Sequence, residues 1–473
     1  MAGSRSIDAA PSDPTLRNPI ATTDMHTRCL PWAFLAASVV SLPTAVAQSI
    51  EPDGTPSEDQ IRRWVRSLDA PQFSERREAL RGLRGLPPES LPTLRDIADA
   101  AGDDVKRRLQ PFLETNAASL TPLHTVRHPK LKGAVDVRLS PEDRFLYVVA
   151  FQSNSLLTFE IPEDRRSLRP VQSFSGRGFG GAIGLATHDD PPRLAMTAFR
   201  NDVVRLFDLD EATGKLSRPV DYNGDAISPS PRFPIGCEFS RDGRLVFVAD
   251  PSLRYRDYRG GLMVLEVTAD RTLQWIDTYL GDAPGQLFNA RSLAVHPTQP
   301  EVFVTGTEAD TLSVIRFDPL GNLQTRQVIT VDDGGPILDG ITGVTVSADG
   351  GHLYVTSGRF GGQSGVAVFG RDAEGSYSLM QDLVTGRDDI GGLTGGNQIV
   401  IAPDGRHVYA TATISDTVHG FRRDPATGRL THIESHTVDT ESKGPTGIAV
   451  TADGRTVYVA VEAAGKIEVF RRD

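Results

Sequence analysis

The residues best suited to chemistry in this sequence are arginines and amides in segments that separate predicted strands. A guanidinium offers paired N–H donors that match a carboxylate or a phosphate, and a neighbouring tyrosine can flank such a group. Each of these residues is therefore a candidate for anion binding, with an ordinary solvated loop residue as the alternative. The candidates are Arg200, Arg254, Arg256, Arg291, Arg359, Asn397 and Gln398.

Two further charges, Arg138 and Glu238, lie within apolar segments that have the character of strands. The matching positions of later repeats are small or apolar, namely Ala294, Thr345, Val400 and Ala449. An unpaired buried charge is costly, so each of the two should reach a partner or a water-filled space. Both a functional and a structural explanation remain open.

A repeat of about fifty residues organises the segment 119–473 and must position these side chains. Its last copy, residues 447–473, reads as three short strands joined by two turns, the first of them Ala452-Asp453-Gly454. Asp-Gly between two apolar runs is a strong hairpin signal. Seven such copies, each with a further outer strand, predict a mainly β fold, a seven-bladed β-propeller; an open β-solenoid is the alternative.

The ends of the repeat region predict how the ring closes. The last repeat stops after its third strand, at Phe470, whereas Thr121–Val126 precedes the first repeat and is similar to the outer strand Leu430–Val438. An N-terminal strand that completes the last blade would remove two open sheet edges. We therefore expect Thr121–Val126 to pair with the C-terminal strand.

The connections between strands fall on two faces of such a ring. The Asp-Gly turns between first and second strands lie on one face, which we call the turn face. The longer and more varied loops, between second and third strands and between blades, lie on the other, the loop face. Binding residues concentrate on variable loops, so we expect the site on the loop face.

Residues 1–47 have the pattern of a secretory signal peptide. Arg28 precedes the apolar run Leu30–Leu42, and Ala45-Val46-Ala47 supplies a cleavage pattern, with Met25 as a possible true start. The run is shorter than the ~20 residues that a membrane span needs. We expect cleavage after Ala47 and a periplasmic or secreted protein without a transmembrane segment; a buried helix of a cytosolic protein is the alternative.

Residues 48–56 read as a linker, and 57–118 as a small helical module. Ser57 and Gln60 have the spacing of a capping box, and apolar residues follow at helical spacing. The module resembles a short HEAT-like pair of repeats. It could dock a partner, or it could be a small bundle that packs on the propeller or tethers it.

Composition excludes several classes of function. A formal net charge of −11 argues against a nucleic-acid partner. Removal of the leader would leave Cys237 as the single cysteine, which excludes an intrachain disulfide and a cysteine zinc site. The run Gly176, Gly178, Gly181 lacks the helix that a dinucleotide site requires. We expect no cofactor and no metal, and a monomeric propeller.

The PDG turns, the Val-Tyr-Val second strands and the "VFRRDPATGRL"-type third strands resemble the lactonase family of seven-bladed propellers. That family includes 6-phosphogluconolactonases and merges into YVTN-type repeat propellers. The resemblance covers about residues 120–473. It implies a fold and, for some members, lactone hydrolysis.

The functional motif of the family is matched only in part. Arg291 and His296-Pro297 agree with a family segment of the form GPRHxxFHPxG, but Ser292 replaces its histidine. Thr307 stands at the position of the family glutamate, and Glu308 follows one residue later. Two hypotheses result: a binding or interaction scaffold for a ligand or partner protein, and a lactone hydrolase. Convergence of Arg291, Glu238 and Glu308 on one pocket would favour the enzyme.

Overall fold

The computed structural model of the chain describes residues 56–84, 86, 90–102, 105–109, 120–163, 167–224, 229–255, 258–283, 285–358, 363–387, 390–438 and 444–472. The predicted signal peptide, most of the linker, Arg256 and Arg359 lie outside these ranges.

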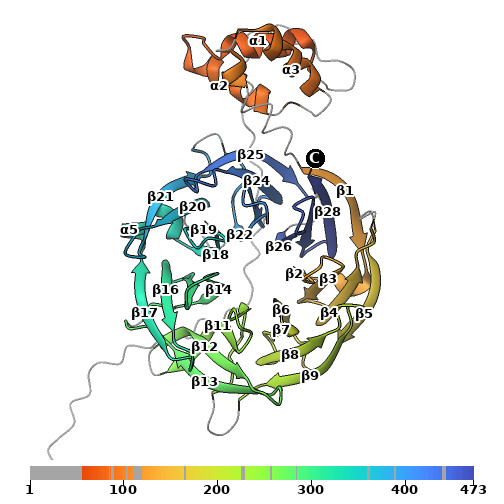
Figure 1. Cartoon of the computed structure of the whole chain (residues 1–473), viewed down its shortest axis with the longest axis vertical. Helices are drawn as coiled ribbons and strands as arrows, with labels where there is room; N and C mark the ends of the chain where they lie inside the picture. The colour runs from red at the N-terminus through yellow and green to blue at the C-terminus, as the bar shows by residue number, and fades with distance from the viewer. Residues whose placement is uncertain are drawn as a thin grey trace, which may run out of the picture. The chain divides into compact units, whose positions relative to one another are not determined.

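Seven four-stranded antiparallel sheets are arranged around an axis, so the fold is the predicted seven-bladed propeller (Figure 1). Each blade runs from an inner strand at the axis to an outer strand at the rim. Blades 1 to 3 comprise β2 (Ala134–Leu139), β3 (Phe145–Ala150), β4 (Ser155–Glu160) and β5 (Arg169–Ser175); β6 (Ala182–Asp189), β7 (Pro192–Ala198), β8 (Val203–Leu209) and β9 (Leu216–Tyr222); and β10 (Cys237–Phe239), β11 (Leu245–Tyr255), β12 (Tyr258–Val267) and β13 (Leu273–Tyr279).

Blades 4 to 6 repeat the same order, and blade 7 takes its outer strand from the N-terminal side of the ring. Short helical turns η2 (Pro129–Leu131), α5 (Val331–Gly334) and η3 (Pro336–Leu338) lie in connections. The strands are β14 (Ala290–Val295), β15 (Glu301–Gly306), β16 (Thr311–Phe317) and β17 (Leu323–Ile329); β18 (Ile341–Val346), β19 (His352–Ser357), β20 (Gly365–Arg371) and β21 (Tyr377–Val384); β22 (Gly396–Ile401), β23 (His407–Ala412), β24 (Thr417–Arg423) and β25 (Leu430–Thr437); and β26 (Pro445–Val450), β27 (Thr456–Val461) and β28 (Lys466–Arg472).

The core consists of side chains packed between neighbouring blades. Second strands are buried on both faces, as for Phe145–Ala150 and Thr456–Val461, which explains their continuous apolar runs. An aromatic residue recurs at one register position of six of them and is buried in each case: Tyr147, Phe247, Phe303, Tyr354, Tyr409 and Tyr458. Interdigitation of these layers holds the blades together.

Closure of the ring follows the prediction. β1 (Leu120–Arg127) pairs antiparallel with β28, with Leu120 opposite Arg472 and Arg127 opposite Lys466. β1 is thereby the outer strand of blade 7 (Figure 1). The first and last segments of the propeller are joined in one sheet.

Blade 2 differs from the sequence alignment by its longer first hairpin. The spacing of the repeats predicts that the first turn of this blade follows Thr187, but β6 continues to Asp189, which pairs with Pro192. The register shows that Ala186, opposite Ala195, is the residue equivalent to Arg138, opposite Tyr147. The sequence lacked the Asp-Gly signal that marks this turn in other blades.

The helical segment contains α1 (Glu58–Ser67), α2 (Phe73–Arg84) and α3 (Leu91–Ala100). The Ser57 hydroxyl accepts a hydrogen bond from the Gln60 amide at 3.3 Å and caps α1. Ile61, Leu83, Leu94, Ile97 and Leu109 form its buried core. No helix among the described residues has both the length and the apolar character needed to cross a membrane.

Candidate functional site

The inner strands form an axial channel with a narrow waist. The seven residues in one register around it, which we call the waist ring, are Asp136, Gly184, Gly236, Ser292, Gly343, Gln398 and Gly447. Four are glycines because the inner strands nearly touch there: a Cβ at Gly184 would lie 2.1 Å from the Ile235 carbonyl oxygen, and one at Gly236 2.5 Å from that of Arg291.

Second-strand threonines tie the waist ring together. Thr197, Thr305, Thr356 and Thr411 each accept a hydrogen bond from the waist residue of their own blade, at 3.0–3.2 Å. Thr197, Thr305 and Thr411 also donate to a carbonyl of the next inner strand, at 2.6, 3.0 and 2.7 Å. At this level the pairing between inner and second strands shifts register, and the threonine bonds hold the strands in place. Because of the shift, two consecutive residues such as Asn397 and Gln398 both line the channel.

Asp136, Arg138 and Gln398 bond to one another at the waist. Asp136 Oδ1 accepts from Arg138 Nη1 at 2.8 Å, from Gln398 Nε2 at 2.9 Å and from the Val137 amide at 2.9 Å. Asp136 Oδ2 accepts from the Leu185 amide at 2.9 Å, and Gln398 Oε1 from the Ile448 amide at 2.8 Å. This network joins blades 1, 2, 6 and 7 and divides the channel into two cavities.

The loop-face cavity measures about 290 Å³. Residues one position before the waist ring form its wall, and we call them the loop ring: Val135, Ile183, Ile235, Arg291, Thr342, Asn397 and Thr446. Blades 1 to 3 supply its apolar half and blades 4 to 7 its polar half. Phe151 and Phe199 extend the apolar half, and exposed Phe233 stacks on Phe199 with ring centroids 4.8 Å apart.

The polar half of the loop ring offers few groups to a ligand. Thr342 and Thr446 donate their hydroxyls to backbone carbonyls at 2.7 and 3.2 Å. The Asn397 carboxamide, on blade 6, has no hydrogen-bond partner among the described residues, and Arg291 belongs to blade 4. Glu462 and Asp136 are the carboxyls that line this cavity.

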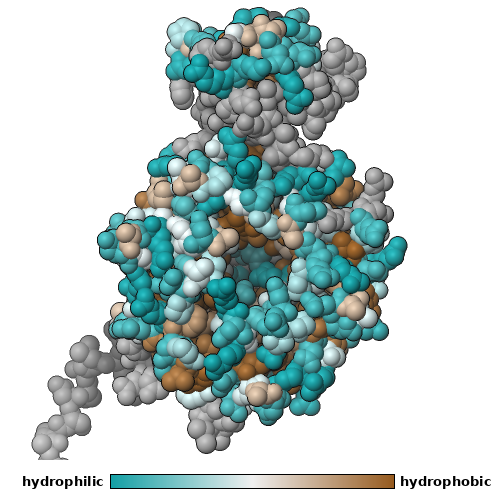
Figure 2. All heavy atoms as spheres, viewed as in Figure 1, coloured by the Kyte–Doolittle hydropathy of each residue, from teal (hydrophilic) through white to brown (hydrophobic). Residues whose placement is uncertain are grey.

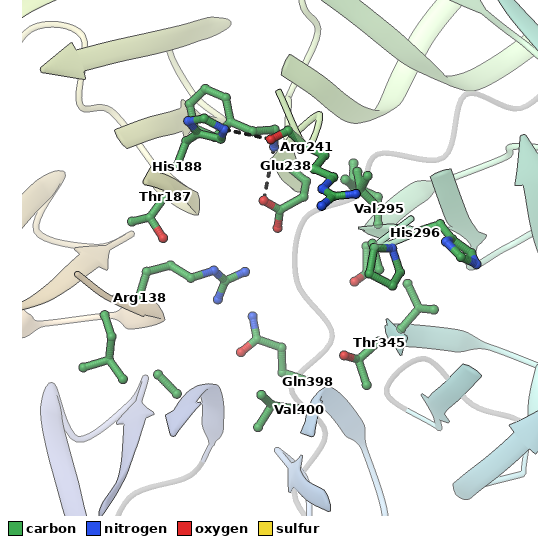
Figure 3. A pocket seen from close by; sticks show the side chains of 18 of the residues that line it. Arg138, Thr187, His188, Glu238, Arg241, Val295, His296, Thr345, Gln398 and Val400 are labelled. Atoms are coloured by element: carbon green, nitrogen blue, oxygen red, sulfur yellow. Dashed lines mark hydrogen bonds between the residues drawn. The ribbon is translucent and has the colours of Figure 1, made fainter. Parts of the chain in front are cut away.

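The turn-face cavity is larger, about 780 Å³. One residue from each inner strand, two positions after the waist ring, lies around this cavity, and we call these residues the turn ring. The cavity is wide because most of their side chains are small. The turn ring consists of Arg138, Ala186, Glu238, Ala294, Thr345, Val400 and Ala449. Arg138, Glu238 and Gln398 all point toward its middle (Figure 3). In the face seen in Figure 2, a central hollow has hydrophilic residues in its depth and hydrophobic residues around it.

Glu238 lies in the turn-face cavity, half-buried. Burial raises the pKa of its carboxyl to about 7, against the opposing effect of the Arg138 guanidinium. Its Oε1 accepts from the Phe239 amide at 3.1 Å. Arg138 and Glu238 thus both reach the channel, as expected for charges within inner strands.

The structure does not bring all candidate residues together. Arg291 and Asn397 line the loop-face cavity, Glu238 lines the turn-face cavity, and Arg138 and Gln398 line both. Glu308 lies outside both and accepts from Asn289 Nδ2 at 3.2 Å. Arg200 stacks over Phe151, 4.3 Å from the ring centroid, and Arg254 belongs to β11. Convergence of Arg291, Glu238 and Glu308 is therefore not observed.

Asp136 and Glu462 line the site but are not among the candidates from the sequence. Asp136 has the same signal as Arg138, a charge within an apolar inner strand, two residues earlier, whereas Glu462 follows the second strand of blade 7 without such a signal. Among the described residues no group of three or more histidine, cysteine, aspartate or glutamate side chains is placed to hold a metal ion.

A family model described as "Lactonase, 7-bladed beta-propeller" matches residues 111–231 and 234–473 of the chain. No curated protein sequence is significantly similar to it.

Solved structures similar to the chain belong to proteins of different functions. A 6-phosphogluconolactonase-like protein of Bacteroides uniformis is 19% identical with a TM-score of 0.52, covering 64% of this chain and 85% of its own. A periplasmic gluconolactonase of Pseudomonas aeruginosa is 18% identical with a TM-score of 0.52, covering 65% and 86%. Hydrazine synthase of Kuenenia stuttgartiensis is 15% identical with a TM-score of 0.54, covering 73% and 97%. At these identities the likeness shows the fold alone.

Proposed function

Because the chain belongs to the lactonase family of seven-bladed β-propellers, we propose that it binds a small sugar derivative in the loop-face cavity, either a sugar lactone or the open-chain sugar acid that corresponds to it. The observation that carries this proposal is the division of the loop ring into an apolar half and a polar half that contains Arg291 and Asn397. A sugar ring has the same division, with C–H faces and hydroxyl or carboxyl edges.

Size and charge support a small, polar ligand. A cavity of 290 Å³ is at the lower end of the ~300–1,000 Å³ typical of ligand pockets, which favours a single ring. Arg291 would bind the carbonyl or carboxylate of the ligand, since guanidinium hydrogen bonds to charged groups are among the strongest in proteins. Asn397 would donate to or accept from a ring hydroxyl.

Hydrolysis of a lactone is the second candidate, and the presence of Glu462 in this cavity favours it. Asp136 is held in the waist network, and we assign the base to Glu462, the other carboxyl that lines this cavity. Glu462 would take a proton from water as the oxygen attacks the lactone carbonyl carbon, with Arg291 stabilising the oxyanion. Cleavage of the ring C–O bond would return that proton to the leaving alkoxide and yield the open hydroxy acid.

Replacing Arg291 should weaken ligand binding with little effect on folding. In Arg291→Gln we expect the affinity for gluconolactone and gluconate to fall about 10- to 100-fold, because one charge-assisted hydrogen bond contributes ~1.5–3 kcal/mol. Isothermal titration calorimetry and thermal melts on the same samples measure both effects.

Arg244→Gln is the matched control, because Arg244 lies on the turn face with an exposed side chain and should leave affinity unchanged. Glu462→Gln separates the two candidates: for an enzyme it should retain binding and lose turnover in a pH-stat assay below pH 7. Arg291→Gln that binds gluconate as wild type does would exclude the loop-face cavity as the site.

We further propose that the protein is exported with cleavage after Ala47. The order of Arg28, Leu30–Leu42 and Ala45–Ala47 supports it. Expressed with its full leader in a bacterial host, the protein recovered outside the cytoplasm should begin at Gln48 by intact-mass spectrometry. Recovery of a protein that begins at Met1 or Met25 would contradict export.

A further inference from the structure

The turn-face cavity contains two opposite charges that do not pair with each other. Glu238 projects from β10 and Arg138 from β2, and both point toward the middle of the cavity (Figure 3). No ion pair joins them among the contacts of the described residues. The gap between them is therefore open to a bound group.

Each of the two side chains has one polar atom without a hydrogen-bond partner among the described residues. Arg138 Nη1 donates to Asp136 at 2.8 Å and to the Val137 carbonyl at 3.0 Å, whereas its Nη2 has no partner among the described residues. Glu238 Oε1 accepts from Phe239, and its Oε2 has no such partner. The Gln398 carboxamide is already hydrogen-bonded within the waist network through both its oxygen and its nitrogen. It therefore forms the floor of the cavity and is not a ligand-binding group.

Part of the wall around this pair of charges is apolar. Leu139, Val344, Val400, Ile448 and Val450 line the cavity, among polar side chains that include Thr187, Ser292 and Thr345. His188, Asp189, Asp190 and Arg241 line it at the first hairpins of blades 2 and 3. The cavity thus combines one donor and one acceptor of opposite charge with apolar patches in its wall.

We propose that the turn-face cavity is a second binding site, separate from the loop-face cavity, for a small amino-acid-like zwitterion with an apolar body. The ligand carboxylate accepts from Arg138 Nη2, its ammonium group donates to Glu238 Oε2, and its apolar part contacts the wall. A zwitterion fits because the free Nη2 of Arg138 is a donor for its carboxylate and the free Oε2 of Glu238 is an acceptor for its ammonium group.

Binding should depend on pH through Glu238. The groups around its carboxyl are Arg138 and Asp136 on β2, His188 on β6, and Cys237 and Arg241 near β10. Burial raises the pKa of Glu238 to about 7, so the carboxylate that receives the ammonium group forms as the pH rises through 7. Affinity should therefore increase between pH 6 and pH 8, and binding at pH 6 should release a proton.

Three matched probes test the proposal by calorimetry with the full-length mature protein: L-leucine, 3-methylbutylamine, which lacks the carboxylate, and 4-methylpentanoate, which lacks the ammonium group. We expect leucine to bind at least tenfold more tightly than either truncated probe. Glu238→Gln, which preserves side-chain shape, should weaken leucine binding at least tenfold at pH 8 and remove its pH dependence. Arg244→Gln, at an exposed ion pair outside both cavities, should leave both unchanged, and His188→Gln should keep the pH dependence.

Several results would overturn the proposal. These are no leucine binding at 10 mM, 4-methylpentanoate binding as tightly as leucine, or Glu238→Gln binding leucine as wild type does. A pH dependence lost in His188→Gln but kept in Glu238→Gln would assign the titration to the wrong group and reject the role of Glu238. Near-ultraviolet circular dichroism of each variant verifies that the fold is retained.

Discussion

Deletion of Leu120–Arg127 is expected to lower the melting temperature by roughly 10–40 °C, or to cause aggregation. The segment forms the outer strand of blade 7 and buries Leu120, while Leu123 and Val126 pack on the core of blades 1 and 7. The strand's hydrogen bonds to β28 contribute ~1 kcal/mol each to the free energy of unfolding, and its buried apolar side chains contribute ~1.5–3 kcal/mol each. Together we expect the deletion to lower that free energy by about 5–10 kcal/mol. Each kcal/mol corresponds to about 2–4 °C in a protein of several hundred residues.

The loss should also expose β28 as an open edge. Thr125 bonds to Glu468 at 2.8 Å, and Glu468 in turn pairs with buried Lys466 at 2.6 Å. Addition of a synthetic peptide with the sequence of residues 120–127 should restore part of the lost stability, whereas a scrambled peptide should not. A deletion variant that melts within 3 °C of the parent would show that β1 does not close the ring.

Glu301→Gln should destabilise the protein by about 3–5 kcal/mol, because it leaves two half-buried guanidinium groups without the buried anion that they share. Glu301 is fully buried at the start of β15 and accepts from Arg326 at 3.0 Å and Arg371 at 3.2 Å, on blades 4 and 5. The loss should appear in chemical denaturation as a lower midpoint with an unchanged slope.

Glu266→Gln provides the matched control. Glu266 pairs with Arg244 at 3.5 Å on the surface, where an ion pair contributes at most ~1 kcal/mol. Replacing Glu301, Arg326 and Arg371 together by methionine should recover most of the stability, since an apolar cluster can substitute for a buried ionic one. Equal midpoints for Glu301→Gln and Glu266→Gln would show that the buried cluster contributes no more than a surface pair.

The sequence predicts the propeller because its signals are local and repeated. Asp-Gly turns mark most of the first hairpins, and glycine takes the left-handed conformation there, as at Gly243 with φ of 66°. Closure could also be predicted, because the strand absent from the last repeat is present before the first. The sequence predicts the turn of blade 2 too early because its first hairpin lacks the Asp-Gly turn.

The sequence predicts the channel side chains less well because their positions depend on contacts between distant blades. Asp136 and Gln398 are hydrogen-bonded across 262 residues of sequence, which no local pattern encodes. The register shifts of the inner strands decide which residue faces the axis, so Arg291 and Glu238 belong to different cavities although both lie on inner strands. The glycines of the waist ring, recurring once per repeat in four blades, were an available signal for this close approach.

Diffraction from crystals soaked with gluconate tests the proposed function most directly, because it shows where the ligand lies. We predict difference density in the loop-face cavity, with the ligand carboxylate at Arg291, a hydroxyl at Asn397 and the carbon chain against Phe151 and Phe199. The same density should be absent from soaked Arg291→Gln crystals. Density located outside this cavity, or retained unchanged in Arg291→Gln, would contradict the account.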